Sequence, residues 1–91
     1  MATSNGSSIL ARIIRPAQGD LTPETARSIL DWDFPKKDQA RIAALSEKAN
    51  DGKLTPEEVP ELEEYILVAE FLALIQSKAR ISLRKPGHPA A

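Results

Sequence analysis

The stretch ANDGKLTPEE, residues 49–58, contains the residue types of a calcium-binding loop. If Gly52 stands at the sixth position of such a loop, Glu47 takes the first ligand position and Glu58 takes the twelfth. The third position is then Ala49, which supplies no oxygen where a carboxylate is needed. Because Ca²⁺ is held by roughly six to eight oxygen ligands, the pattern lacks a complete ligand set. We therefore interpret this stretch as a turn between two helices and expect no metal site.

Helix capping explains the same residues. Asn50 and Asp51 are predicted to end one helix, and Gly52 to take the left-handed backbone conformation that follows a helix end. Thr55 and Glu58 match a capping box, in which each side chain accepts a hydrogen bond from the backbone N–H of the other residue. The next helix is therefore expected to begin at this box.

Residues suited to catalysis are scarce elsewhere in the chain. There is no cysteine, and the only histidine is His88, so Ser77 and Ser82 lack a histidine base within the folded part. The glutamates of residues 57–64 are explained by the positive end of a helix, which favours carboxylates. No glycine-rich phosphate loop or dinucleotide fingerprint is present. We therefore predict a protein that is not an enzyme and that uses no cofactor.

The composition is typical of one small soluble domain. The chain has 91 residues, of which 42% are hydrophobic and 27% charged, and its formal net charge is −1. This net charge argues against a general binder of nucleic acids or membrane surfaces. Residues 1–8 lack the apolar core of a secretory signal, and the apolar run of residues 65–75 is too short to span a bilayer. We therefore expect a cytoplasmic protein.

The hydrophobic pattern and the capping residues predict an all-α fold of about four helices, with three short helices packed on one long C-terminal helix. Ser8 and Pro16 are expected to bound the first helix, and Thr22 to begin the second. The third helix is predicted over residues 35–50 and the long helix over residues 56–84.

The domain boundaries and one irregularity follow from the same pattern. We expect a disordered leader over residues 1–7, a single helical domain over residues 8–85 and a flexible tail over residues 86–91. Pro60 is expected to bend or fray the first turn of the long helix, because its N–H is missing where the hydrogen-bond ladder should begin.

One six-residue pattern, Gly-x-Leu-Thr-Pro-Glu, occurs at residues 19–24 and again at residues 52–57. Six residues at a turn are too few to demonstrate an internal duplication. We interpret the two copies as independent solutions to the same problem of starting a helix.

The long helix is apolar over most of its circumference, so it must be covered on several sides. One interpretation is that its apolar residues simply form the core of a monomer. The other is that part of this surface binds another protein or a second copy of the chain. We favour the second interpretation, because a domain this small has little area with which to cover a long apolar helix. The predicted interaction stripe consists of Phe71, Leu72, Ile75 and Ala79.

The C-terminal end of the long helix is basic. Four cations occur without an intervening acidic residue: Lys78, Arg80, Arg84 and Lys85. They could contact the phosphates of a nucleic acid. They could equally complement the negative end of the helix dipole, and they are spread around the helix with no aromatic residues between them. Nucleic-acid binding is therefore kept as the alternative function.

Several segments resemble a family of small, uncharacterised bacterial proteins that are all-helical. The resemblance covers residues 9–83 and rests on GDLTPETAR, on GKLTPEE, on LALIQSKARISL, and on Phe34 with Asp38 and Arg41. It implies a small helical bacterial protein, and the family has no activity, cofactor or catalytic residue to carry over. Val59 and Pro60 depart from the more polar helix start expected of the family.

Taken together, the residues predict a non-enzymatic protein-interaction module in the bacterial cytoplasm. It would act through its long apolar helix, as a homodimer or as the partner of a larger protein. One concrete form is a small antitoxin-like inhibitor or regulatory partner, an interpretation that rests on size and composition. No membrane contact is expected.

Overall fold

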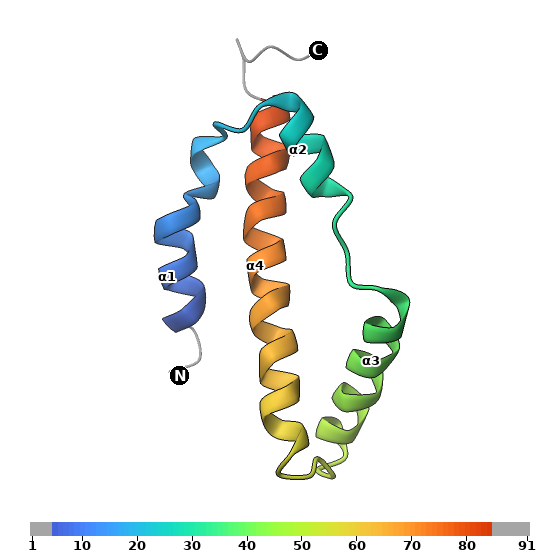
Figure 1. Cartoon of the computed structure of the whole chain (residues 1–91). Helices are drawn as coiled ribbons and strands as arrows, with labels where there is room; N and C mark the ends of the chain where they lie inside the picture. Colours follow the sequence, from blue (N-terminus) through green and yellow to red (C-terminus); the bar gives the residue numbers. More distant parts are fainter. Residues whose placement is uncertain (1–4, 85–91) are drawn as a thin grey trace. The chain divides into compact units, whose positions relative to one another are not determined.

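The computed structural model describes the backbone of residues 5–84 and the side chains of residues 9–84. Within this range it contains four α-helices, one 3₁₀ turn and no strand (Figure 1). The elements are α1 (Asn5–Ile14), η2 (Pro16–Gln18), α2 (Pro23–Leu30), α3 (Lys36–Asn50) and α4 (Glu58–Arg84). The prediction of an all-α fold with three short helices and a long C-terminal helix is therefore confirmed. None of the described helices combines the length and the apolar character needed to cross a membrane.

The chain forms two compact units, and the long helix α4 contributes to both. The first unit comprises residues 1–32 and 70–91, so its described part holds α1, η2, α2 and the second half of α4. The second unit comprises residues 33–69 and holds α3 and the first half of α4. The first unit therefore holds two short α-helices and the second unit holds one, each unit with its own part of α4.

The core of the first unit is small and built around alanines. Ala26 and Ile29 of α2 pack with Ala79 of α4, and both alanines are fully buried. Small side chains at the contact allow two helices to approach closely, at the lower end of the usual 8–10 Å between axes. Four partly buried hydrophobic residues surround this contact: Leu21, Leu30, Ile75 and Leu83.

In the first unit, polar side chains of α4 form hydrogen bonds with the chain segments that pack on this helix. The fully buried Ser82 accepts a hydrogen bond from the backbone N–H of Leu21 (3.1 Å) and donates one to the carbonyl of Lys78 (2.8 Å). Gln76 donates to the carbonyls of Ile29 (3.0 Å) and Trp32 (2.8 Å) at the end of α2. The Ile29 carbonyl also accepts from the N–H of Trp32 (3.0 Å), so Gln76 adds a second hydrogen bond to the local turn that ends α2.

The start of α2 agrees with the sequence prediction, whereas the start of α1 does not. Thr22 is the N-cap of α2, and its Oγ1 accepts a hydrogen bond from the N–H of Thr25 (3.2 Å), while Pro23 occupies the first helical position. Helix α1 begins at Asn5, so Ser8 lies inside the helix and not at its N-cap. Residues 1–4 of the predicted leader lie outside the described residues.

The second unit is a helical hairpin of α3 and the first half of α4. Leu45 of α3 is its fully buried apolar residue. Phe34 and Tyr65 meet edge to face, with ring centroids 5.8 Å apart and an interplanar angle of 69°. The Tyr65 hydroxyl donates a 2.6 Å hydrogen bond to Asp38, which ties the ring of α4 to the first turn of α3.

The turn between α3 and α4 has the predicted capping geometry. Gly52 has a φ of +69°, and the N–H of Lys53 donates to the carbonyl of Lys48 (2.8 Å), as expected after a helix end. The N–H of Thr55 donates to the Glu58 carboxylate (3.1 Å), and the N–H of Glu58 donates to Thr55 Oγ1 (3.2 Å). The stretch with calcium-loop residue types is therefore a helix-connecting turn with a capping box.

Pro60 lies in the first turn of α4, which begins at Glu58. The N–H of Val59 donates to the carbonyl of Thr55 (3.2 Å), so one helical rung forms directly after the capping box. The next rung would run from residue 60 to the carbonyl of Pro56, but proline has no N–H to donate. The helix starts at Glu58, two residues later than predicted, and runs through Pro60. The first N–H groups of a helix have no partner within the helix, so a proline in the first turn fits there, and the expected bend or fray at Pro60 stays a prediction.

Replacing Gly19 and Gly52 separately with alanine tests how the two copies of the repeated pattern differ. Both glycines have positive φ, +51° and +69°, so alanine should cost about 1 kcal/mol or more of unfolding free energy at either site. A Cβ on Gly19 would also lie 2.8 Å from Ile81 Cγ2 and 3.2 Å from the Ile81 carbonyl carbon, whereas nothing lies within 4 Å at Gly52. We expect Gly19→Ala to be the more destabilising change by about 1–3 kcal/mol in urea unfolding. Equal losses would contradict the close packing at Gly19.

Candidate protein-interaction site

The predicted interaction stripe lies largely within the chain's own packing. Ala79 is 0% exposed, and Ile75 packs against the cluster that contains it. Phe71 and Leu72 are half-buried. The sequence pattern identified these residues as apolar but could not assign them to an internal or an external contact. Ala79 offers no surface to a partner in this structure.

The basic end of α4 is also partly used within the chain. Lys78 Nζ donates to the carbonyl of Ile14 (2.6 Å) and forms a 2.8 Å ion pair with Asp20, and its side chain is only 12% exposed. Hydrogen bonding to Lys78 lowers the pKa of the Asp20 carboxyl. Arg80 and Arg84 are exposed, and Lys85 lies outside the described residues. Lys78 therefore binds the last residue of α1 and the segment that follows it, a role that its sequence position did not reveal.

The largest exposed apolar side chains of the second unit lie on the first half of α4. Ile66 and Leu67 are each 49% exposed, and Val59 and Val68 are exposed to a smaller extent. These residues stand outside the predicted stripe, nearer the start of the helix. Among the described side chains of the first unit, Ile9, Ile13 and Trp32 are the large apolar ones that remain exposed.

An apolar groove of about 250 Å³ runs between α3 and α4 in the second unit. We call it the α3–α4 groove, and its lining residues are Ile42, Ser46, Ala49, Asn50, Leu62, Tyr65, Ile66 and Ala69. None of these eight residues carries a charge at neutral pH. On each helix they recur at offsets of four and seven residues, which places them on one helical face. The groove is thus an uncharged surface whose outer edge is the half-exposed Ile66.

A second cavity, of about 370 Å³, opens on the same hairpin. We call it the acidic pocket, and its lining residues are Phe34, Asp38, Glu61, Glu64, Tyr65 and Val68. Three of these residues are carboxylates and two are aromatic. Asp38 accepts the hydrogen bond from Tyr65, and this bond raises the pKa of the Tyr65 phenol. Tyr65 is the one residue that lines both the groove and the pocket.

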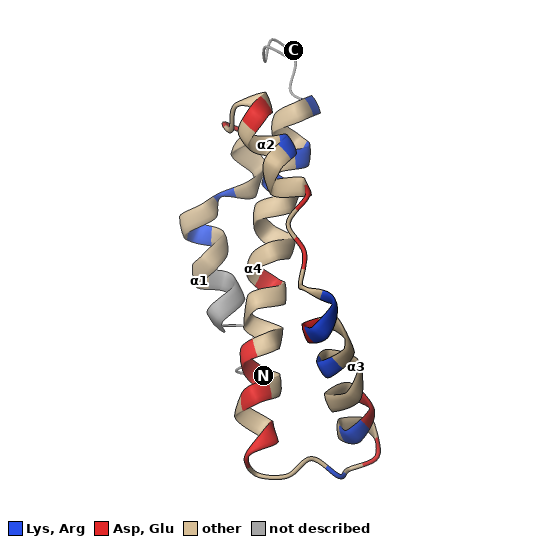
Figure 2. Ribbon diagram, turned by 45° about the vertical axis from the view of Figure 1, so that its right-hand side comes forward, with Lys and Arg blue, Asp and Glu red and all other residues tan. Residues whose placement is uncertain are grey.

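An ion-pair network joins α3 to the start of α4. Arg41 binds Glu61 through two hydrogen bonds, from Nε (2.9 Å) and Nη2 (2.8 Å), and also lies 3.6 Å from Glu58. Lys48 Nζ lies 2.6 Å from the Glu58 carboxylate. Figure 2 shows the underlying charge distribution, with acidic residues along the first half of α4 and most basic residues of the hairpin on α3. The pairing lowers the pKa of the Glu61 carboxyl and raises that of the Arg41 guanidinium.

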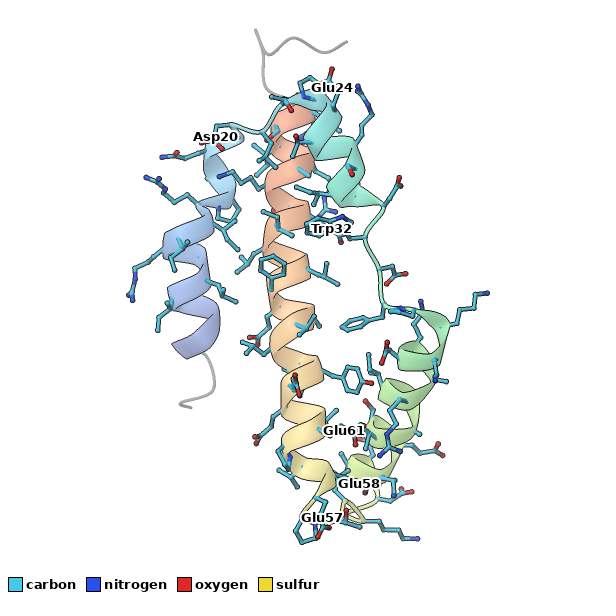
Figure 3. The ribbon with its side chains drawn as sticks, in the orientation of Figure 1. Asp20, Glu24, Trp32, Glu57, Glu58 and Glu61 are labelled. Atoms are coloured by element: carbon cyan, nitrogen blue, oxygen red, sulfur yellow. The ribbon has the colours of Figure 1, made fainter. Side chains whose placement is uncertain are left out.

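Glu58 is the carboxylate on which the network and the capping box converge. It interacts with Lys48, Arg41 and the N–H of Thr55, and its side chain is only 13% exposed. The hydrogen bond from Lys48, followed by that from the Thr55 backbone, lowers the pKa of Glu58 from 4.5 to about 2. Glu58 and Glu61 lie on the side of α4 that faces α3, as Figure 3 shows. These internal contacts occupy the carboxylate that the calcium-loop pattern would need as its last ligand.

The acid sensitivity of folding should depend on Glu58. Because its pKa is lower in the folded protein than the usual 4.5, its contribution is fully present above that pH and is lost as the pH falls towards 2. We expect Glu58→Gln to lower stability at pH 7 and to flatten the stability profile between these two pH values, measured by urea unfolding across the range. Glu57→Gln is the matched control, since Glu57 is exposed and has no ion-pair partner among the described residues. An unchanged acid limb in Glu58→Gln would contradict this assignment.

Comparison with known proteins gives no match: no protein-family model, no curated protein and no solved structure is similar to the chain.

Proposed function

We propose that this protein is a non-enzymatic interaction module whose α3–α4 groove binds an amphipathic helix of a partner protein. The observation that carries the proposal is the exposed Ile66 at the edge of a groove with no charged lining residue. Burial of apolar surface contributes roughly 25 cal/mol per Å², so a partner that covers this edge gains binding energy without having to dehydrate a charge inside the groove.

The spacing of the lining residues supports a helical partner. Leu62, Ile66 and Ala69 form one ridge of the groove, and residues 42–50 of α3 form the other. A third helix can lay its own apolar side chains between two such ridges, which is the usual mode of helix-in-groove recognition. The small side chains of Ala49 and Ala69 leave room for the close approach that this packing needs.

Charge at the rim supports a partner with basic flanks. Glu63 is exposed beside the groove residue Leu62 and has no ion-pair partner among the described residues. Rim charges of one sign favour a partner of the opposite sign, mainly through faster association and through selection against other partners. An apolar helix flanked by lysine or arginine fits both features. The size of the chain suits a small antitoxin-like inhibitor or another regulatory partner of a larger protein.

A pair of neighbouring variants tests the proposal. Ile66 and Leu67 are both 49% exposed, but only Ile66 lines the groove. We expect Ile66→Glu to weaken partner binding by at least about tenfold, because a charge would be buried at the contact, whereas Leu67→Glu should retain wild-type affinity. The partner is first identified by affinity capture from the native cell, with the wild type and both variants compared side by side. Affinities are then measured with the purified partner by calorimetry.

Circular dichroism and thermal unfolding serve as the folding control, since both substitutions lie at half-exposed positions and should change stability little. Similar affinities for the two variants, or a loss in Leu67→Glu alone, would contradict binding in the groove. If capture instead yields nucleic acid, and binding depends on Arg80 and Arg84, the alternative function replaces this proposal.

A further inference from the structure

We infer that the acidic pocket binds an arginine side chain supplied by the partner protein. That the arginine comes from a partner protein rests on the proposed function. The chemistry by which the pocket binds an arginine does not depend on that function. The pocket combines a cavity of about 370 Å³ with two aromatic rings and three carboxylates. An arginine carries a flat cationic group with several N–H donors on an apolar stem, which matches these three properties together.

The walls of the pocket suit both parts of an arginine. Phe34 and Tyr65 are held edge to face, so their rings have a fixed orientation beside the cavity. A guanidinium stacks on aromatic faces and is attracted by their electron density. Val68 completes the apolar part of the lining, against which the methylene stem of an arginine can pack.

The three carboxylates differ in what already binds them. Asp38 accepts from Tyr65, and Glu61 is held by both nitrogens of Arg41. Glu64 lines the pocket and has no hydrogen-bond or ion-pair partner among the described residues. Because Arg41 compensates only one of the three negative charges directly, the pocket retains a negative charge with Glu64 as its unpaired acceptor. Arg41 already engages both oxygens of Glu61, so an incoming guanidinium would bind mainly to Glu64.

The pocket and the groove lie on opposite sides of Tyr65. Relative to Tyr65, the pocket residues of α4 stand at offsets of −4, −1 and +3, and the groove residues at −3, +1 and +4. At 3.6 residues per turn, these two sets fall on opposite flanks of the tyrosine. A partner helix in the groove therefore leaves the pocket open, and the arginine is a separate contact of the same partner.

Titration with N-acetyl-argininamide, followed by NMR, tests the pocket without the partner. Tyr65 is the only tyrosine of the chain, so its ring resonances can be assigned without ambiguity. We expect saturable shifts of the Tyr65 and Phe34 signals with a dissociation constant of roughly 1–10 mM, as for a single side chain. Binding should weaken at high salt, because the pocket is open to solvent. N-acetyl-citrullinamide, which has the same shape without the charge, should give no saturable shift.

Two neighbouring glutamates provide matched variants. Glu64→Gln should raise the dissociation constant by about threefold, whereas Glu63→Gln removes the same charge outside the pocket and should leave it unchanged. Equal effects of the two variants, or equal binding of the citrulline compound, would overturn the inference, as would the absence of any saturable shift at Tyr65. Ile66→Glu should still bind the arginine compound, so failure of the groove and failure of the pocket are distinguished.

Discussion

The main physical constraint on this protein is the apolar circumference of α4, which is wider than any one short helix can cover. A 27-residue helix with apolar side chains on several faces needs neighbours along its whole length. In the first unit, α2 brings Ala26 and Ile29 against Ala79, and the small side chains allow close contact. In the second unit, α3 packs on α4 with Leu45 fully buried. A two-helix hairpin has only one internal face, so both flanks of its contact remain accessible.

This geometry explains why the two candidate binding features occur where they do. They flank Tyr65, the residue that faces α3 and hydrogen bonds to Asp38. On one flank the residues are apolar or small, and on the other they are acidic and aromatic. The difference arises from the sequence of α4. Glu61 and Glu64 fall on the flank of the pocket, whereas Leu62, Ile66 and Ala69 fall on the flank of the groove. A single tyrosine thereby separates an uncharged groove from a negatively charged pocket.

The glutamates at the start of α4 serve two separate purposes. Glu58 and Glu61 are tied to Lys48 and Arg41, and they fix α3 against α4 at the turn. Surface ion pairs usually contribute little, but this network is anchored by the low exposure of Glu58 and by the two-bond contact of Arg41. Other glutamates of the same stretch carry charge without such partners. The helix dipole accounts for the presence of acidic residues here, whereas the contacts with α3 determine which of them are free to bind.

The sequence by itself determined the features that depend on contacts within a few residues. The N-cap Thr22, the capping box of Thr55 with Glu58 and the left-handed Gly52 all follow from local backbone hydrogen bonding. The helix count followed as well, because turn residues and hydrophobic periodicity mark each helix separately.

Only the tertiary structure decided which apolar and charged residues are used inside the chain. Periodicity identifies an apolar face but not the neighbour that covers it, so Ala79 was predicted as a contact for a partner and lies in the core. Lys78 was counted with the basic end but is held by Asp20 and by the carbonyl of Ile14, more than fifty residues away in the chain. The groove and the pocket depend in the same way on residues of α3 and α4 that meet only in the folded hairpin, and a one-dimensional pattern does not encode that meeting.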